Sequence, residues 1–521
     1  MLNKICHIVD LYHTCPERTR IGQPGMLFLI VFAVVGLSTS ALPAVQLFAG
    51  AAKVDITDWK AGPVNDRLYV KALVLKSGIT TAVMITVDTV AIGEIGGIKN
   101  DYLPKVRSKL KKEFGIPPTN VLVNASHCHG VICSDVDVRT FQAVQIATKN
   151  MVPVTIGAGS GHENRIMENR RLQLTDGRTI DVRHAYSLPP DEKVAKVGPV
   201  DPEIGILRLD RLDGRTLAVV YNFACHPIQG VPSGGNTADL TGFASQVLEE
   251  TLSEGTIALF IQGCGGDINP VTYKDVDNPR DAEPLGHKLG LSALKAIRKV
   301  QTKEDDRLIV INETITLPRA DTHQRIVAME TEQERLLRSL RGTSLNLKTF
   351  LALTMKYNVA GKFPSYYSHR YLHEETIGRA DLRHLDAENR SNMKRYMENV
   401  YTMEQLTRLQ TNLTLLKKHQ TTFLAGGTRT IDVELLGVRI GDFVLITFPG
   451  ELTVQIGLNI KQVSPHERTF VAGYTNGYIY YAPTAEQLVN VGRAQEDSDC
   501  MLAPEWQNIF EDKAVELLEK L

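Results

Sequence analysis

Two histidines separated by one residue, His127 and His129, lie in the segment VNASHCHGVIC, where a β-type apolar run ends. Alternate residues of an extended chain point the same way, so both imidazoles can face one site. Imidazole nitrogens bind zinc, and a catalytic zinc site keeps an open position for water. A histidine at a strand end is also a common hydrogen-bonded structural residue. The spacing alone leaves both interpretations open.

Three other segments share this arrangement of a β-type run followed by metal-binding side chains. They are NFACHP with His226, FPGELTVQIG with Glu451, and NGYIYYAP with Tyr478, Tyr480 and Tyr481. The ends of neighbouring strands in an α/β sheet lie together, so these side chains can share one site. Each also has a structural alternative, because a glutamate after Pro-Gly favours a helix N-terminus and tyrosines pack in cores.

The elements that would position these residues follow an α/β pattern over residues 51–317. Strands are predicted for AVMITVDTV, NVLVNAS, GILRLDR, TLAVVYNFACH and TIALFIQG, and amphipathic helices for NDYLPKVRSKLKKEFG and FASQVLEETLSEG. Asp213 and Gly214 predict a hairpin turn between two of these strands. The alternation predicts an α/β fold with a layered mixed sheet flanked by helices.

Residues 321–424 differ from the rest because they are polar and rich in Glu, Arg, Leu and Lys at helical spacing. They predict a helical insertion that serves as a lid or a flank. After LAGGTRT the β pattern returns, and EDKAVELLEKL predicts a closing helix.

The charge balance excludes one class of function. The 521 residues contain 58 Lys and Arg against 59 Asp and Glu, which gives a formal net charge of -1. A nucleic-acid-binding protein normally shows a basic surplus or a basic run. We therefore expect no nucleic-acid partner.

The N-terminus has the pattern of an export signal. The uncharged run MLFLIVFAVVGL at residues 26–37 follows Arg18 and Arg20 and precedes STSALPA. It is shorter than the roughly 20 apolar residues of a membrane span, and basic residues before and small residues after such a run are typical of a secretory signal. We predict removal of residues 1–41 and a secreted or periplasmic protein. An uncleaved anchor is the alternative, and Met26 is an alternative start.

Seven cysteines are present, and five follow the predicted signal: Cys128, Cys133, Cys225, Cys264 and Cys500. They form no CxxC pair and no zinc-finger spacing. Three of them lie inside the candidate motifs, where we interpret them as small apolar fillers. Thiolate ligation of a metal is the competing interpretation.

Taken together, the motifs resemble the neutral/alkaline non-lysosomal ceramidase family. The segments that carry the resemblance are NASHCHG, NFACHP followed by ADLTGFAS, QGCGGDINP, FPGE and GYTNGYIYY, in the order in which that family has them. They extend over residues 50–493, and the resemblance implies one ceramidase-like zinc hydrolase domain over residues 50–521 with the insertion inside it.

The resemblance implies a set of metal ligands. In that family two histidines, the glutamate of the PGE motif and a tyrosine bind one zinc ion. The matching positions here are His127, His226, Glu451 and Tyr481. The tyrosine rests on Asn-x-Tyr-x-x-Tyr spacing, which leaves Tyr478 and Tyr480 as alternatives.

The resemblance also implies residues that act on the substrate. His129 corresponds to a histidine that contacts the substrate or the activated water, and Arg170 to a substrate-contacting arginine. Arg171 competes for that role, and a structural salt bridge is the alternative for either arginine. Asp267 is predicted to orient a ligand histidine or, alternatively, to cap a turn.

The sequence departs from the family pattern at two places. Asn269 stands in the motif GDINP where the family has a serine implicated in catalysis. An amide is not a nucleophile like an activated hydroxyl, but it can donate a hydrogen bond to a developing oxyanion. The chain also ends soon after the tyrosine motif, without room for the β-sandwich domain of family members, so we expect substrate presentation at a membrane to differ.

The implied function is zinc-dependent cleavage of an N-acyl amide bond, converting ceramide to a sphingoid base and a fatty acid by metal-activated water. The expected partner is a lipid or N-acyl amide substrate, with peripheral membrane contact. Two alternatives are a related metallohydrolase that acts on a different amide or ester, and a non-catalytic binding protein of the same fold.

Overall fold

The computed structural model describes residues 46–182, 188–230, 236–273, 275, 277, 280–364, 368–492 and 494–521. The predicted export signal, residues 1–41, lies outside them. Among the helices that are described, none combines the length and the apolar character needed to cross a membrane.

A mixed sheet of eight strands forms the first layer of strands, in the order β12-β11-β10-β5-β1-β2-β3-β4. The two end pairs, β3 with β4 and β11 with β12, are parallel, and the pairs between them are antiparallel. The strands are β1 (Phe48–Asp55), β2 (Tyr69–Ser77), β3 (Thr80–Val87), β4 (Val121–Ala125), β5 (Val152–His162), β10 (Glu203–Arg211), β11 (Thr216–Phe223) and β12 (Ile257–Gln262).

Apolar residues point to both faces of this sheet. In β2, Ala72 and Val74 pack in the core under the helices, and Leu73 and Leu75 pack toward a second sheet. This two-sided burial explains the continuous apolar runs of the sequence. Helices α1 (Tyr102–Phe114), α2 (Val136–Lys149), α3 (Asp239–Thr251) and α4 (Glu283–Ile297) cover the outer face.

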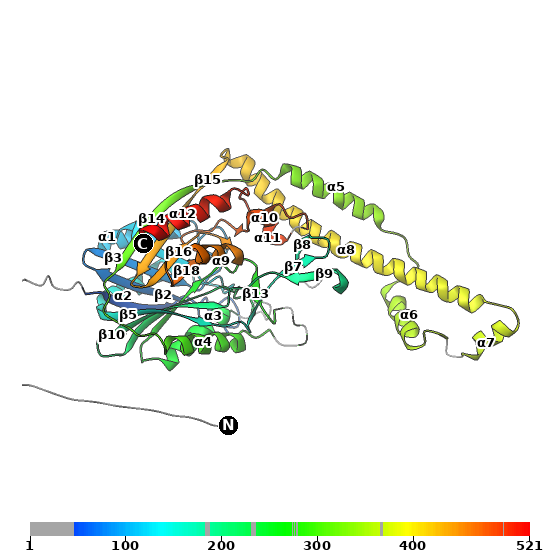
Figure 1. Cartoon of the computed structure of the whole chain (residues 1–521), viewed down its shortest axis with the longest axis horizontal. Helices are drawn as coiled ribbons and strands as arrows, with labels where there is room; N and C mark the ends of the chain where they lie inside the picture. Colours follow the sequence, from blue (N-terminus) through cyan, green and yellow to red (C-terminus); the bar gives the residue numbers. More distant parts are fainter. Residues whose placement is uncertain are drawn as a thin grey trace, which may run out of the picture. The chain divides into compact units, whose positions relative to one another are not determined.

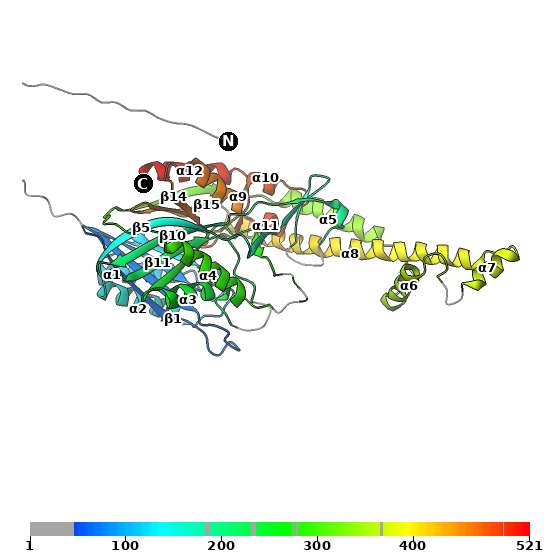
Figure 2. The same cartoon turned by 60° about the horizontal axis from the view of Figure 1, so that its bottom comes forward.

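The second sheet has four strands in the order β14-β15-β16-β18 and packs on the inner face of the first. It comprises β14 (Leu308–Pro318), β15 (Thr430–Ile440), β16 (Phe443–Thr447) and β18 (Thr469–Ala472), covered outside by α9 (Val454–Val463) and α12 (Trp506–Lys520). Figure 2 shows these layers in turn, from α12 and α9 through both sheets to α4 and α3. The predicted layered mixed α/β fold is confirmed.

The predicted helical insertion is also confirmed, and it joins β14 to β15. It consists of α5 (His323–Ser339), α6 (Leu347–Val359), α7 (His369–Thr376) and α8 (Asp381–Gly426). β14 and β15 pair along their whole length as far as Pro318 opposite Thr430, so the insertion leaves and re-enters the sheet at one point. Figure 1 shows α5 along the part of α8 nearest the sheets, and α6 and α7 beside its other end.

Short strands and helices at the edge of the two large sheets carry most of the candidate site. β6 (Met167–Asn169) pairs with β13 (Ile268–Pro270), and β17 (Glu451–Leu452) pairs with β19 (Tyr481–Ala482). β7 (Arg171–Leu174) pairs with β8 (Thr179–Asp181) and β9 (Val194–Val197). Two single-turn helices follow, α10 (Ala485–Leu488) and α11 (Gln495–Ser498).

Candidate metal centre

Three of the predicted ligands follow strands that end at the same side of the molecule. His127 follows β4, His226 follows β11, and Glu451 follows β16 and opens β17. Asn124 of β4 holds these strand ends together. Its Nδ2 donates to Gly473 O over 2.8 Å, and its Oδ1 accepts from Gln262 N over 2.9 Å. This buried amide therefore ties β4 to β12 and to the loop after β18.

The side chains of His127, His226 and Glu451 converge. One ligand atom from each residue lies within 4.8 Å of the others. Glu451 Oε2 is 3.1 Å from His226 Nε2 and 3.5 Å from His127 Nε2. All three residues are about 2% exposed. Residues far apart in the chain thus form one buried polar cluster.

Backbone carbonyls fix the tautomer of both histidines. His127 Nδ1 is 2.6 Å from Val90 O, and His226 Nδ1 is 2.6 Å from Gly265 O and 3.1 Å from Ile268 O. A carbonyl oxygen only accepts, so Nδ1 carries the hydrogen in the neutral rings and Nε2 presents a lone pair. Both lone pairs then face the carboxylate, and a shared cation would satisfy all three donors.

The electrostatics keep the cluster in its ligand state. Burial lowers the pKa of His127 to about 4, so this imidazole is neutral at pH 7. Burial alone would raise the pKa of Glu451, but the positive charge that His127 and His226 carry when protonated, together with the hydrogen bond from the Tyr478 hydroxyl, lowers that pKa well below its usual range. Neutral imidazoles and a carboxylate are the donor set of many zinc sites, so the residues fit a zinc ion.

Two tyrosines orient the carboxylate. The Tyr474 hydroxyl donates to Glu451 Oε2 over 3.2 Å, and the Tyr478 hydroxyl donates to Glu451 Oε1. The Tyr474 ring also lies 4.3 Å from the His127 ring, centroid to centroid. Burial raises the pKa of both phenols well above the ordinary value, so both stay protonated donors. Sequence reasoning missed Tyr474, although it lies in the quoted segment GYTNGYIYY.

The predicted ligand Tyr481 lies beside Arg170. Its hydroxyl is 3.2 Å from Arg170 Nη2, and its residue pairs with Glu451 where β19 meets β17. The structure therefore places Tyr481 next to the cluster, and its coordination of a metal stays a prediction. Tyr480, one of its alternatives, packs against His419 of α8, with ring centroids 4.8 Å apart.

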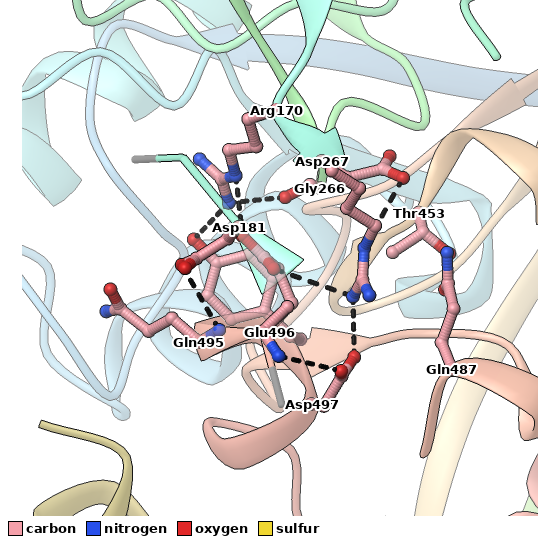
Figure 3. A network of polar contacts seen from close by, with 12 residues as sticks. Arg170, Asp181, Gly266, Asp267, Thr453, Gln487, Gln495, Glu496 and Asp497 are labelled. Carbon is pink, nitrogen blue, oxygen red and sulfur yellow. Dashed lines mark hydrogen bonds and ion pairs between the residues drawn. The ribbon is translucent and has the colours of Figure 1, made fainter. Parts of the chain in front are cut away.

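Arg170 contacts the residues around Asn269, which stands where the resembled family has a serine. Its guanidinium donates to Asn269 Oδ1 over 2.9 Å and to Gly266 O over 2.5 Å, and its Nε lies 2.5 Å from Glu496 Oε1. Figure 3 shows Arg170 between Gly266 and Glu496. Asn269 is fully buried, and its Nδ2 has no hydrogen-bond partner among the described residues. Arg170 thus fixes the amide with its oxygen engaged and its donor available.

Arg171 belongs to the same buried ion-pair network, because its Nη2 lies 3.5 Å from Glu496 Oε2. Its Nη2 lies 2.6 Å from Asp497 Oδ1, and its Nε lies 3.7 Å from Asp267 Oδ2. Asp267 Oδ1 accepts from Val454 N over 2.8 Å, which caps the N-terminus of α9. The carbonyls of Gly265 and Ile268 contact His226 Nδ1. The role predicted for Asp267 in orienting a ligand histidine stays a prediction.

His129 lies at the outer edge of the cluster. It is exposed, whereas His127 is buried, and the two ring centroids are 5.6 Å apart. Its place fits a group that meets substrate or solvent rather than a fourth buried ligand. Its catalytic role stays a prediction.

Helices of the insertion contact the network around the cluster. Arg408 of α8 donates to Asp181 Oδ1 over 2.6 Å. Asp181 Oδ2 accepts from Gln495 N over 3.2 Å, and Figure 3 shows these two residues next to each other. Arg325 of α5 donates to Asp497 O over 2.7 Å. The insertion therefore flanks the residues that hold Arg170 and Arg171.

Four residues near the cluster have left-handed backbone conformations. The φ angles of His127, Tyr474, Asn476 and Tyr480 are 68°, 53°, 58° and 62°. This conformation is uncommon outside glycine and costs of order 1–3 kcal/mol per residue. Such strain gathers where side chains must be aimed at one point, which agrees with a functional centre.

The cysteines of the motifs do not belong to the cluster of potential ligands within the described part of the chain. Cys128, Cys225 and Cys264 are buried, and burial raises the pKa of each thiol well above its ordinary value. They are therefore neutral thiols, as expected of apolar fillers.

The layered fold with a histidine–histidine–glutamate cluster at its strand ends defines an α/β protein with a candidate metal centre. No protein-family model matches the chain. Two solved structures share its fold. The crystal structure of neutral ceramidase from Pseudomonas aeruginosa matches with a TM-score of 0.56 and 16% identity, covering 92% of this chain and 75% of that one. A ceramidase complexed with C2 matches with a TM-score of 0.57 and 17% identity, covering 92% and 76%. The neutral ceramidase-like fold predicted from the motifs is confirmed.

Proposed function

We propose that the protein is a zinc-dependent hydrolase that cleaves the N-acyl amide bond of ceramide or a closely related lipid amide. One observation carries the proposal: two imidazoles whose Nδ1 atoms face backbone carbonyls turn their Nε2 atoms toward one buried carboxylate. They do so in a fold shared with neutral ceramidase. The intact cluster argues against a non-catalytic binding protein, which has no need of such a site.

The residues of the cluster have different roles in the proposed reaction. His127, His226 and Glu451 would hold the ion, and Tyr474 and Tyr478 keep the carboxylate in place by hydrogen bonds. A bound zinc ion supplies a Lewis acid that polarises a carbonyl oxygen and lowers the pKa of water.

The remaining groups act on the substrate. The free Nδ2 of Asn269 donates a hydrogen bond to the carbonyl oxygen as negative charge develops there. Water adds to the carbonyl carbon, the C–N bond breaks, and the leaving amine takes up a proton. His129, at the exposed edge, accepts the proton that the water loses and delivers it to the amine nitrogen. Arg170 keeps Asn269 and Tyr481 in position.

A second candidate is a related hydrolase that acts on another amide or on an ester. Asn269 favours it, because the amide replaces the serine expected at this position. Without a hydroxyl, residue 269 cannot be the nucleophile, and the proposed chemistry rests on activated water. Under either candidate we infer export through residues 1–41.

The test combines metal analysis with substrate comparison. Purified protein should retain about one zinc per chain, and it should release fatty acid from ceramide. Glu451→Gln, which keeps the size of the side chain but removes its charge, should lose both. Cleavage of soluble N-acyl or ester substrates without cleavage of ceramide would favour the second candidate. A folded protein that binds no divalent metal would contradict both.

A further inference from the structure

Helix α6 of the insertion carries apolar residues on two sides. The side toward α8 is packed: the Phe350 ring stacks on the Tyr396 ring with centroids 4.7 Å apart, and the Tyr357 hydroxyl donates to Asp386 Oδ1 over 3.0 Å. The Arg390 guanidinium lies 4.3 Å from the Tyr357 ring centroid. This side therefore fixes α6 on α8.

The opposite side of α6 is apolar and exposed. Leu347, Leu351, Met355 and Val359 are 60%, 57%, 72% and 82% exposed. They are spaced four residues apart, so they form one continuous row along the helix, which we call the α6 stripe. A helix that is apolar all round is normally buried all round. An exposed row of this kind marks a binding surface.

The charges on α6 indicate what that surface binds. The helix reads LKTFLALTMKYNV, with Lys348 and Lys356 and no acidic residue, and Lys362 follows it. A short helix with an apolar row and lysines beside it is typical of segments that lie on anionic membranes. Lysine side chains can keep their ammonium groups at the lipid headgroups while apolar neighbours enter the acyl region.

The insertion presents α6 away from the candidate metal centre. Figures 1 and 2 both show α6 beside the part of α8 that lies farthest from the sheets. Arg383 of α8 holds the segment that follows α6 by donating to Lys362 O over 2.7 Å. The stripe is therefore carried by a braced helix pair and not by a loop.

We propose that the α6 stripe docks the protein on the surface of a bilayer that contains anionic phospholipids. The inference deepens the proposed function, because a lipid amide substrate resides in a bilayer. α6 has 13 residues, about 20 Å of helix, which is shorter than the hydrocarbon core of a bilayer. It therefore lies in the interface and does not cross the membrane.

A second copy of the chain fits the stripe less well. A twofold dimer through α6 would place the same surface on both sides, since such an interface is isologous. Lys348 and Lys356 would then lie near their own copies without an acidic residue of α6 to compensate them. An anionic membrane compensates these charges.

The experiment is vesicle flotation of the full chain with phosphatidylcholine vesicles and with vesicles that also contain phosphatidylglycerol. Leu351→Glu combined with Met355→Glu should lower the vesicle-bound fraction at least about tenfold. The matched control is Leu212→Glu with Val463→Glu, two residues of the main body with 60% and 59% exposure. The control should bind like wild type. All variants keep residues 26–37, so that apolar run contributes equally.

Charge reversal tests the lipid preference. Lys348→Glu with Lys356→Glu should remove the preference for vesicles with phosphatidylglycerol, as should high salt with the wild-type protein. Equal binding of wild type and the Leu351/Met355 variant would overturn the proposal. A dimer that dissociates in this variant would assign the stripe to a second copy and would also overturn it.

The design separates this inference from the proposed function. His127→Ala should bind vesicles like wild type although it loses its metal site. The Leu351/Met355 variant should cleave a soluble N-acyl substrate at the wild-type rate and cleave the vesicle-bound lipid more slowly. If the wild type bound vesicles but hydrolysed no substrate, only the proposed hydrolase function would be contradicted. If it hydrolysed substrate but did not bind vesicles, only the proposed docking of the α6 stripe would be contradicted.

Discussion

Glu496 Oε1 lies 2.5 Å from Arg170 Nε, and both side chains are almost completely buried, at 0% and 1% exposure. Arg170 also contacts Asn269 and Tyr481 through its guanidinium group. The ion pair therefore supports residues that we expect to contact the substrate. A buried charge needs a partner, so Glu496 is what allows Arg170 to occupy this place. Glu496 is therefore a positioning residue.

Removal of the charge on Glu496 tests this role. Glu496→Gln should lower kcat by about ten- to hundredfold with little change in KM, because the misplaced groups act on the reaction and not on lipid binding. It should also lower the free energy of unfolding by about 3 kcal/mol, since Arg170 stays buried without full compensation. Steady-state kinetics and denaturant unfolding measure the two effects.

The matched control for this variant is Glu163→Gln. Glu163 is a buried carboxylate in an ion pair with Arg165, at the end of β5. Its loss should lower stability and leave kcat unchanged. If both variants lowered kcat equally, the effect of Glu496 would be one of stability and not of positioning.

The metal site gives a second prediction. His127→Ala should retain no zinc after dialysis, and added zinc should no longer raise its Tm, because a ligand stabilises only the state that binds it. His466→Ala is the control, since His466 Nε2 contacts Leu518 O and lies outside the cluster. The control should keep its zinc. Equal zinc retention in the two variants would contradict the assignment of the cluster.

The convergence of the site residues could be predicted because they follow strand ends, whereas their choice as metal ligands rested on the family resemblance. His127, His226 and Glu451 each come directly after an apolar run, and the ends of adjacent strands lie together. The sequence could not decide between Arg170 and Arg171, since both are buried in ion pairs with acidic residues that lie far along the chain. Only the fold shows that the two arginines share Glu496 and that Arg171 also pairs with Asp497.

Other site residues were missed because their sequence pattern suggests the opposite environment. The segment AQEDSDC is polar and predicts an exposed turn, yet Glu496 and Asp497 in α11 are completely buried. Their burial depends on two arginines contributed by another part of the chain. Asn124 was missed for the same reason, since its partners Gly473 and Gln262 are distant in sequence.

Asp66 provides a prediction about stability and pH. Burial, with help from Asp88 and Asp239, raises the pKa of Asp66 to about 7, although Ala238 N donates to it over 3.0 Å. The folded pKa exceeds the unfolded value, so this contribution is complete below about pH 4 and is lost as the pH rises through 7. The free energy of unfolding should fall by about 2 kcal/mol over this range. Asp66 is partly exposed, so solvent screening keeps this loss below the value that the full pKa shift implies. Urea unfolding from pH 4 to pH 8 should show that the stability of the wild type, relative to that of Asp66→Asn, declines over this range. A difference between the two proteins that does not change with pH would contradict the assignment.

Substitutions of Asn269 test whether its amide stabilises the negative charge that develops on the carbonyl oxygen. Its Oδ1 accepts from Arg170 Nη1 over 2.9 Å, and its buried Nδ2 is the donor left for substrate. Asn269→Asp keeps the size of the side chain and the contact with Arg170 but removes that donor, so activity should fall about 10²- to 10³-fold. Asn269→Ser restores a hydroxyl donor and should keep or raise cleavage of ceramide. Rates of fatty-acid release from ceramide measure both variants. If Asn269→Asp were as active as wild type, the amide would not stabilise the developing charge. If Asn269→Ser lost activity while it remained folded and kept its zinc, a hydroxyl could not replace the amide donor here.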